Sequence, residues 1–231
     1  MRILFDNKLN NATLSSLHPN SLYPVTRLKD SFLKRIYKST ETSDTITIMF
    51  ASEITVDCVY IGFTNATSAS LTLKDSSNNT LYSGAINVLR GGGVITQVPG
   101  VKSAIVSLSG TDNIYLGTIG IGDSYTMPDP LNDIVKSFVD NSETYQSNDG
   151  QYSKNKIAWL LFVKASFATV DDIDLYNEIF LLFSSIDRPV WLDCFENVTG
   201  ALNPLYCSME FKTDSKNDRV FKFSFEATEA R

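Results

Sequence analysis

The chain has 231 residues, 43% of them hydrophobic, and a formal net charge of −6 at pH 7. A chain of this length holds one large domain or two small ones, each with a core of its own. It contains no run of about 20 apolar residues, which argues against a membrane span. Its N-terminal stretch is too polar for a signal peptide.

The three cysteines are odd in number and follow no metal-binding spacing. We expect Cys58, Cys194 and Cys207 to be buried free thiols, with a contact between Cys194 and Cys207 on adjacent strands as the alternative. Free thiols suit a protein made in a reducing host cytoplasm.

Residues 1–44 form a basic segment without a regular pattern. The first 40 residues carry seven basic and two acidic side chains, a net charge of +5, whereas the rest of the chain carries a net charge of −11. We expect this segment to pack on the first domain as loops and turns, with Ile3–Phe5 as a short edge strand. Its charges form a solvated face or, alternatively, dock on an acidic patch of a neighbouring copy. Because the remaining surface is acidic, no nucleic-acid binding is expected.

The pattern of residues 45–123 predicts a jelly-roll β-sandwich of some eight short strands. Thr45–Phe50 alternates between apolar and polar residues, and Ile54–Phe63 is apolar on both faces, as in a central strand. The further strands predicted are Ala69–Lys74, Thr80–Ser83, Val94–Val98, Ala104–Leu108 and Ile114–Ile121. Gly91–Gly93 lacks the lysine of a phosphate-binding loop, so we interpret it as a turn.

Residues 124–155 are interpreted as a linker, because Pro128 and Pro130 fall near its start and its polarity is high. Within it, Asn148-Asp149-Gly150 is a turn signal that predicts a hairpin flanked by Tyr145 and Tyr152.

Residues 156–231 are predicted to form a second β-sandwich domain with one flanking helix. The helix lies within Thr169–Pro189, with its core at 171–186, because apolar residues recur there at three- and four-residue spacing. Thr169 and Asp172 fit a capping box at its start. The strands predicted around the helix are Lys156–Lys164, Pro189–Phe195, Leu205–Lys212 and Val220–Thr228. The last two alternate strictly between apolar and polar residues, which predicts one buried and one solvated face.

The sequence holds no recognisable catalytic motif. His18 is the only histidine, which excludes any site that needs two histidines from one chain. We therefore expect no catalysis and no cofactor. Asp193 and Glu196, near a strand end, are the best candidates for the carboxylate pair of a glycan-degrading enzyme.

Two alternative kinds of ligand site involve the loops of the first domain. The candidates for calcium ligands are Asp75, Asn78 and Asn79, or Asp112 and Asn113. The tyrosines that are candidates for a glycan platform are Tyr23, Tyr82, Tyr115 and Tyr125.

Two parts of the chain resemble known families. The first domain, with YPVTRLKDSFLKRIY, TITIMFASEITVDCVYIGFTN and NIYLGTIGIGD, resembles the discoidin or galactose-binding jelly roll, particularly as found in virion proteins of tailed bacteriophages. The second, with ETYQSNDGQYSKNKIAWLLFV, RPVWLDCF and FSFEATEAR, resembles the tail-tube and distal-tail family, whose copies form a ring around the tail channel. Distal-tail proteins usually place the ring-forming domain first and the sugar-binding-like domain second, so a different baseplate, tail-tip or adaptor position is the alternative.

The resemblance implies a structural protein of a virion tail, which assembles with copies of itself and with other tail proteins. Ring subunits need two complementary flanks. The residues expected at such a subunit interface are Arg27, Lys29, Lys34 and Arg35 from the basic segment and Leu175 and Leu182 from the helix. The first rival function is a carbohydrate-binding adhesin that holds a host-surface glycan in the jelly-roll loops. The second is a glycan-degrading enzyme.

Overall fold

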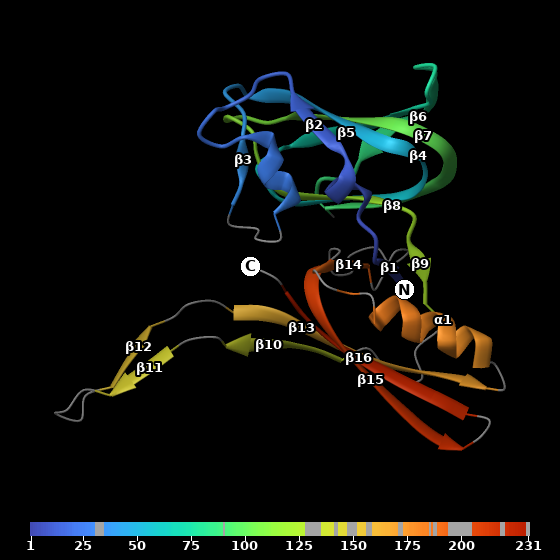
Figure 1. Ribbon diagram of the computed structural model, residues 1–231. Helices are drawn as coiled ribbons and strands as arrows, with labels where there is room; N and C mark the ends of the chain where they lie inside the picture. Colours follow the sequence, from blue (N-terminus) through green and yellow to red (C-terminus); the bar gives the residue numbers. More distant parts are fainter. Residues whose placement is uncertain are drawn as a thin grey trace. The chain divides into compact units, whose positions relative to one another are not determined.

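The structure, a computed structural model, describes residues 1–30, 35–89, 91–127, 135–140, 143–146, 152–155, 159–170, 173–184, 186, 189–193, 205–217 and 220–229. The chain divides into two compact units (Figure 1). Unit 1 comprises Met1–Met127 and Val190–Tyr206, and unit 2 comprises Pro128–Pro189 and Cys207–Ala230. The described part of the fold is mainly β with one α-helix, as the sequence predicts.

Unit 1 is built from strands and two short 3-10 helices. The helices are η1 (Lys8–Asn11) and η2 (Val25–Lys29). The strands are β1 (Arg2–Leu4), β2 (Thr13–Ser16), β3 (Tyr37–Lys38), β4 (Ser43–Thr64), β5 (Ser68–Lys74), β6 (Thr80–Ile86), β7 (Gly92–Ser109), β8 (Tyr115–Gly122), β9 (Tyr125–Thr126) and β14 (Val190–Asp193).

The sandwich of unit 1 is one sheet, in the order β3-β8-β4-β7-β5-β6 with β2 on β4, which folds over into two layers. The long strands β4 and β7 pair over both their halves: Ser43–Met49 lies opposite Ser103–Ser109, and the stretch from Ile54 to Tyr60 lies opposite residues 92–101. Register shifts between the two halves mark bulges, which bend a strand without ending it. Figure 1 shows the resulting turn of β4 and β7 at one end of the unit.

Bulges also explain why the predicted strands were too many and too short. Thr45–Phe50 and Ile54–Phe63 join in β4, and Val94–Val98 and Ala104–Leu108 join in β7. The intervening residues resemble turns in their composition, but they stay within bent strands.

A single cluster of buried apolar side chains fills the sandwich. The basic segment contributes to it through Leu9, Leu28 and Tyr37, all at most 1% exposed. Ile46 of β4 and Leu71 of β5 are equally buried. Residues 1–44 are therefore part of the core of unit 1, in addition to carrying its positive charge.

A small second cluster places β14 in unit 1. β1 pairs with β14 on one side (Ile3 opposite Leu192) and with β9 on the other, so the predicted edge strand is an interior one. Trp191 of β14 is 2% exposed and stacks on Tyr60 at 5.4 Å between ring centroids. It lies flat against two glycines: a Cβ built on Gly120 would be 2.4 Å from Trp191 Cδ1. The predicted division at residue 156 did not anticipate this return of the chain to unit 1.

Unit 2 is one antiparallel sheet with a helix. Its elements are β10 (Val135–Asp140), β11 (Glu143–Gln146), β12 (Tyr152–Asn155), β13 (Trp159–Val170), α1 (Ile173–Ser184), β15 (Leu205–Asn217, in unit 2 from Cys207 on) and β16 (Val220–Glu229). The strand order is β10-β13-β16-β15, and β11 and β12 pair with each other as a hairpin within the predicted linker. Among the described residues of this unit, α1 rather than a second sheet covers the sheet.

The helix packs through the apolar face that the sequence predicts. Ile179 and Phe183 are buried, and the ring of Phe183 stacks on that of Phe211 at 4.3 Å. Phe180, also on the predicted stripe, is 44% exposed. The predicted capping box is wrong, because Thr169 lies in β13 and pairs with β16, where it completes the ladder instead of starting the helix.

Cys58 is a buried free thiol, as predicted, and Cys207 is buried; Cys194 lies outside the described residues. Burial is the main cause that raises the pKa of the Cys58 thiol well above its ordinary value.

Candidate functional site

Loops converge at one end of the unit 1 sandwich, because both ends of β4 lie there. Gly110 in the β7–β8 loop touches both: its N–H donates to Thr42 O at 2.9 Å, and a Cβ built on it would lie 3.1 Å from Asn65 O. The β3–β4 loop is tied to the same place, since Ser39 N donates to Ile114 O at 2.7 Å. Three connections of the fold, β3–β4, β4–β5 and β7–β8, thus meet at this end of unit 1.

An open depression of about 630 Å³ lies among these loops. Its lining residues are Asn20, Lys38, Ser39, Asn65, Asp112, Asn113 and Tyr115. The side chain of Asn65 bridges two of them, donating to Asn113 O at 3.1 Å and accepting from Tyr115 N at 2.8 Å. The Asn113 amide in turn donates to Thr40 O at 3.1 Å. These bonds hold the loops in position without a ligand.

An exposed aromatic pair stands beside the depression. The ring of Phe63 lies 5.7 Å from that of Tyr115, with the two planes tilted by 46°. Phe63 is 60% exposed and has a φ of +54°, in the left-handed region that bulky residues rarely adopt. Backbone strain of this kind is found at ligand sites more often than elsewhere. We call Phe63 together with the lining residues of the depression the loop-end site.

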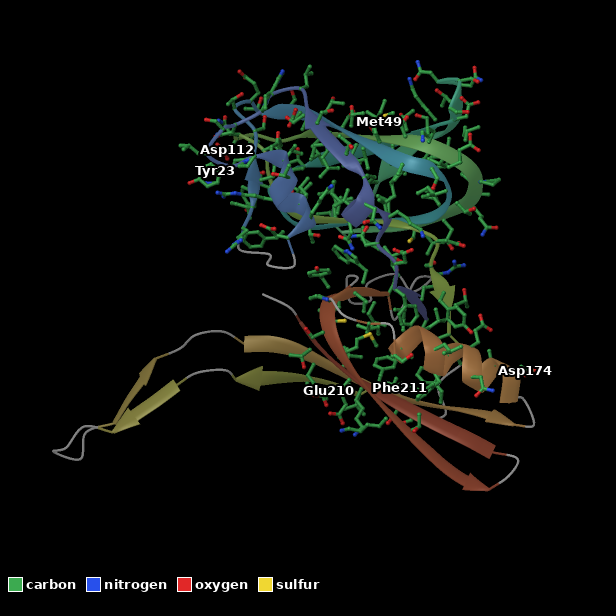
Figure 2. The ribbon with its side chains drawn as sticks, viewed as in Figure 1. Tyr23, Met49, Asp112, Asp174, Glu210 and Phe211 are labelled. Atoms are coloured by element: carbon green, nitrogen blue, oxygen red, sulfur yellow. The ribbon has the colours of Figure 1, made fainter. Side chains whose placement is uncertain are left out.

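Tyr23 lies near this site, and two cationic side chains contact the face of its ring. Lys38 Nζ lies 4.7 Å, and Arg27 Cζ 5.0 Å, from the ring centroid. Figure 2 shows Tyr23 and Asp112 at the same end of unit 1.

The four tyrosines predicted for a glycan platform therefore separate into two groups. Tyr115 lines the depression, and Tyr23 contacts its Lys38. Tyr82 lies in β6 with its hydroxyl against Gly84, and Tyr125 lies in β9 edge-on to Phe5. Neither Tyr82 nor Tyr125 lines the depression.

The residues predicted for a subunit interface fall in both units. Arg27 and Lys29 lie in η2, and Arg35 forms an ion pair with Asp30 at 3.8 Å. Lys34 lies outside the described residues. Leu175 and Leu182 are half-buried in α1 of unit 2. Their part in a subunit contact stays a prediction.

The loop predicted as a calcium site forms a closed turn. The Asp75 carboxylate accepts hydrogen bonds from Ser77 N, Asn79 N and Asn79 Nδ2, at 2.8 to 2.9 Å. The bonds from Asn79 are the main cause that lowers the Asp75 pKa below its ordinary value. Asn78 Oδ1 accepts from the Lys74 ammonium, which would repel a cation. Across the described part of the chain, no group of three or more acidic, histidine or cysteine side chains is arranged to hold a metal.

The carboxylate pair predicted for an enzyme is not supported. Asp193 is fully buried at the end of β14, opposite Arg2 in the β1–β14 register. It is inaccessible to a substrate, because β14 is packed into unit 1 instead of ending at the surface. Glu196 lies outside the described residues.

Sequence reasoning missed Phe63, Asn20, Asn65 and Lys38. Phe63 ends an apolar run and looks like the last inward residue of a strand. The only local signal of a loop is the polar Thr64-Asn65 that follows it. The amides share no motif, and only the fold brings them together.

Comparison with known proteins gives structural neighbours for about half of the chain. The lectin-binding domain of lectinolysin, in complex with Lewis b, aligns with a TM-score of 0.43 at 12% identity, covering 50% of this chain and 94% of that one. A chitosan-binding module of a Paenibacillus sp. IK-5 chitosanase/glucanase aligns with a TM-score of 0.43 at 17% identity, covering 51% and 99%. The family 32 carbohydrate-binding module of Streptococcus pneumoniae EndoD aligns with a TM-score of 0.41 at 13% identity, also covering 51% and 99%.

No protein-family model and no curated protein sequence matches the chain. The TM-scores of the structural neighbours lie below 0.5, so we base the proposed function on the residues of the loop-end site. None of the helices among the described residues has the length and apolar character needed to cross a bilayer.

Proposed function

We propose that unit 1 binds carbohydrate in the loop-end site and does so without catalysis. The observation that carries this proposal is the pair of exposed Phe63 and half-buried Tyr115 beside a depression whose lining includes three asparagines, one aspartate and one lysine.

The chemistry of these residues suits a sugar. A pyranose ring offers an apolar C–H face, which packs on an aromatic ring, and an edge of hydroxyl groups. Each asparagine amide donates and accepts hydrogen bonds, and the Asp112 carboxylate accepts from two neighbouring hydroxyls. The volume of about 630 Å³ is in the range of small-molecule sites, large enough for a short oligosaccharide.

The loop-end site is also preorganised for a ligand. Asn65 and Asn113 use part of their hydrogen-bonding capacity to fix the loops, as described above. Both residues line the depression. A ligand that binds to fixed loops loses less free energy to ordering of the protein.

Binding without hydrolysis follows from the carboxylates. Glycoside hydrolysis commonly uses two carboxyl groups about 5 to 10 Å apart. Among the described residues, Asp112 is the only acidic one that lines the depression.

A glycan-array screen followed by titration calorimetry tests the proposal. Replacing Phe63 by Ala removes the stacking face, and we expect a loss of affinity of about tenfold or more. Phe180→Ala is the matched control, because Phe180 is a partly exposed aromatic residue of unit 2. Absence of binding to any glycan, or equal losses in the two variants, would contradict the proposal.

The role in a virion tail, with self-assembly into a ring and location in the particle, stays a second proposal that rests on the family resemblance. Glycan binding by unit 1 is compatible with it, since a tail protein can contact the host surface. Immunogold labelling of purified particles tests this location directly: label confined to the tail supports it, and particles without label would refute it.

A further inference from the structure

One cation of the loop-end site, Lys38, and a second that shares the Tyr23 ring with it, Arg27, lack a carboxylate partner. Lys38 and Arg27 both lie over the ring of Tyr23, and neither forms an ion pair with any described carboxylate. Arg2 and Arg35 of unit 1 are paired instead, with Asp57 at 2.8 Å and with Asp30. Lys38 and Arg27 differ from these arginines in that an aromatic ring takes the place of the carboxylate.

The two cations are held in place by contacts that leave their charge uncompensated. The backbone N–H of Lys38 donates to Tyr23 O at 3.2 Å, and Arg27 Nη1 donates to Ile36 O at 3.4 Å. The contact with the Tyr23 ring stabilises a cation but uses none of the N–H donors of the ammonium. Lys38 also lines the depression, so its donors are available to a ligand there.

The surrounding charges favour an anionic ligand. The first 40 residues have a net charge of +5 in a protein of net charge −6. Asp112 is the one acidic residue among the described lining residues, and its carboxylate accepts a hydrogen bond from Thr111 Oγ1 at 3.4 Å. The site therefore offers a positive end near Lys38 and Arg27 and a hydroxyl-accepting end at Asp112.

We propose that the loop-end site recognises acidic sugars, with a ring carboxylate, as in a uronic acid, bound by Lys38 in the field of Arg27. The hydroxyls of the same sugar are bound by Asp112 and the asparagine amides, and the sugar ring packs on the aromatic pair. This inference rests on the proposed glycan binding and specifies its ligand class.

The test compares two ligands with the same sugar backbone, whose carboxyl groups are charged in one and neutral methyl esters in the other. Oligomers of polygalacturonate and their fully methyl-esterified form are titrated into the full-length protein, at low and at physiological ionic strength. We expect the acidic form to bind at least about tenfold more tightly, the value of one hydrogen bond to a charged group. This preference should shrink as salt is added.

Two lysine variants test which residue causes the preference for the acidic form. Lys38→Gln should lower the affinity for the acidic form by about tenfold or more and that for the esterified form by much less, so that the preference for the acidic form is lost. Lys102→Gln is the control, because Lys102 is a half-buried lysine of unit 1 that donates to Ala51 O and lies outside the depression. A comparison of binding to dextran sulfate and to dextran shows whether a sulfate group can take the place of the carboxylate. If Lys38→Gln and Lys102→Gln lose equal affinity for dextran sulfate, the binding is that of a non-specific polyanion, which would overturn the inference.

The outcomes separate the two proposals. Equal affinity for both forms, with binding still lost in Phe63→Ala, would overturn the acidic-sugar inference and leave glycan binding intact. Absence of binding to either form and to all neutral glycans of the array would refute both.

Discussion

Trp191 is predicted to stabilise unit 1 from a position far along the chain. Its indole ring is 2% exposed and occupies the space left by two glycines. A Cβ built on Gly62 would lie 2.8 Å from Trp191 Cη2, and one on Gly120 would lie 2.5 Å from Trp191 Nε1. Distances under 3 Å to a rigid buried ring cannot be accommodated without movement, so each glycine is required by the tryptophan.

The magnitudes follow from this packing. Trp191→Ala should lower the free energy of unfolding by about 3–5 kcal/mol, because it leaves a cavity between β14 and the sheet. Gly120→Ala should cost about 1–3 kcal/mol, because the added methyl group overpacks the same place. In the double variant the methyl group enters the cavity, so the double variant should be no less stable than Trp191→Ala alone. The coupling free energy between the two sites is then about 1–3 kcal/mol.

Urea unfolding followed by circular dichroism measures the cycle, since the tryptophan that would report by fluorescence is itself replaced. Gly93→Ala serves as a control, because a Cβ built on Gly93 meets no atom within 4 Å. Strict additivity of Trp191→Ala and Gly120→Ala would refute the packing of β14 against unit 1.

Three further predictions concern buried and paired groups. The Cys58 thiol, whose pKa is raised mainly by burial, should resist iodoacetamide in the native protein at pH 8.5 and react after unfolding; rapid native labelling of its peptide would contradict this. Tyr37→Phe should destabilise unit 1 by about 1–3 kcal/mol, because the buried Asp44 carboxylate loses a hydrogen-bond donor. Calorimetric melting measures this change, and an unchanged stability would contradict the prediction. The hydrogen bond from Lys164, at 2.9 Å, is the main cause that lowers the pKa of Glu226 below its ordinary value. The pair therefore stabilises the fold at pH values above the ordinary glutamate pKa, and this stability is lost as the pH falls through the lowered pKa. Lys164→Gln should raise the Glu226 pKa in an NMR titration, and an unchanged pKa would disprove the assignment.

The periodicity of apolar residues predicted those strands and helices whose buried face is set by their own sequence. The alternation of residues 205–212 reports which side of β15 faces the core: Cys207 is buried and its neighbour Ser208 exposed. The three- and four-residue spacing found the helix in the same way, through Ile179 and Phe183. A stripe of apolar residues predicts a buried face whatever the rest of the chain does.

Features that depend on distant residues were not predictable. Thr169 is spaced from Asp172 as in a helix-capping box, but it pairs with β16 and therefore belongs to strand β13. Nothing near Trp191 in the sequence indicates that Gly62 and Gly120 form its binding surface. The loop-end site depends in the same way on the bending of β4, which brings residues 42 and 65 to Gly110.

The exposed ring of Phe63 offers the most direct test of glycan binding by unit 1. Phe63→Asn suits this test, because asparagine tolerates the left-handed backbone conformation that Phe63 adopts at φ +54°. Calorimetric titration of glycan into wild-type protein and Phe63→Asn should show saturable binding in the first and a loss of about tenfold or more in the second, with no fall in thermal midpoint. Unchanged affinity in the folded variant would contradict the account.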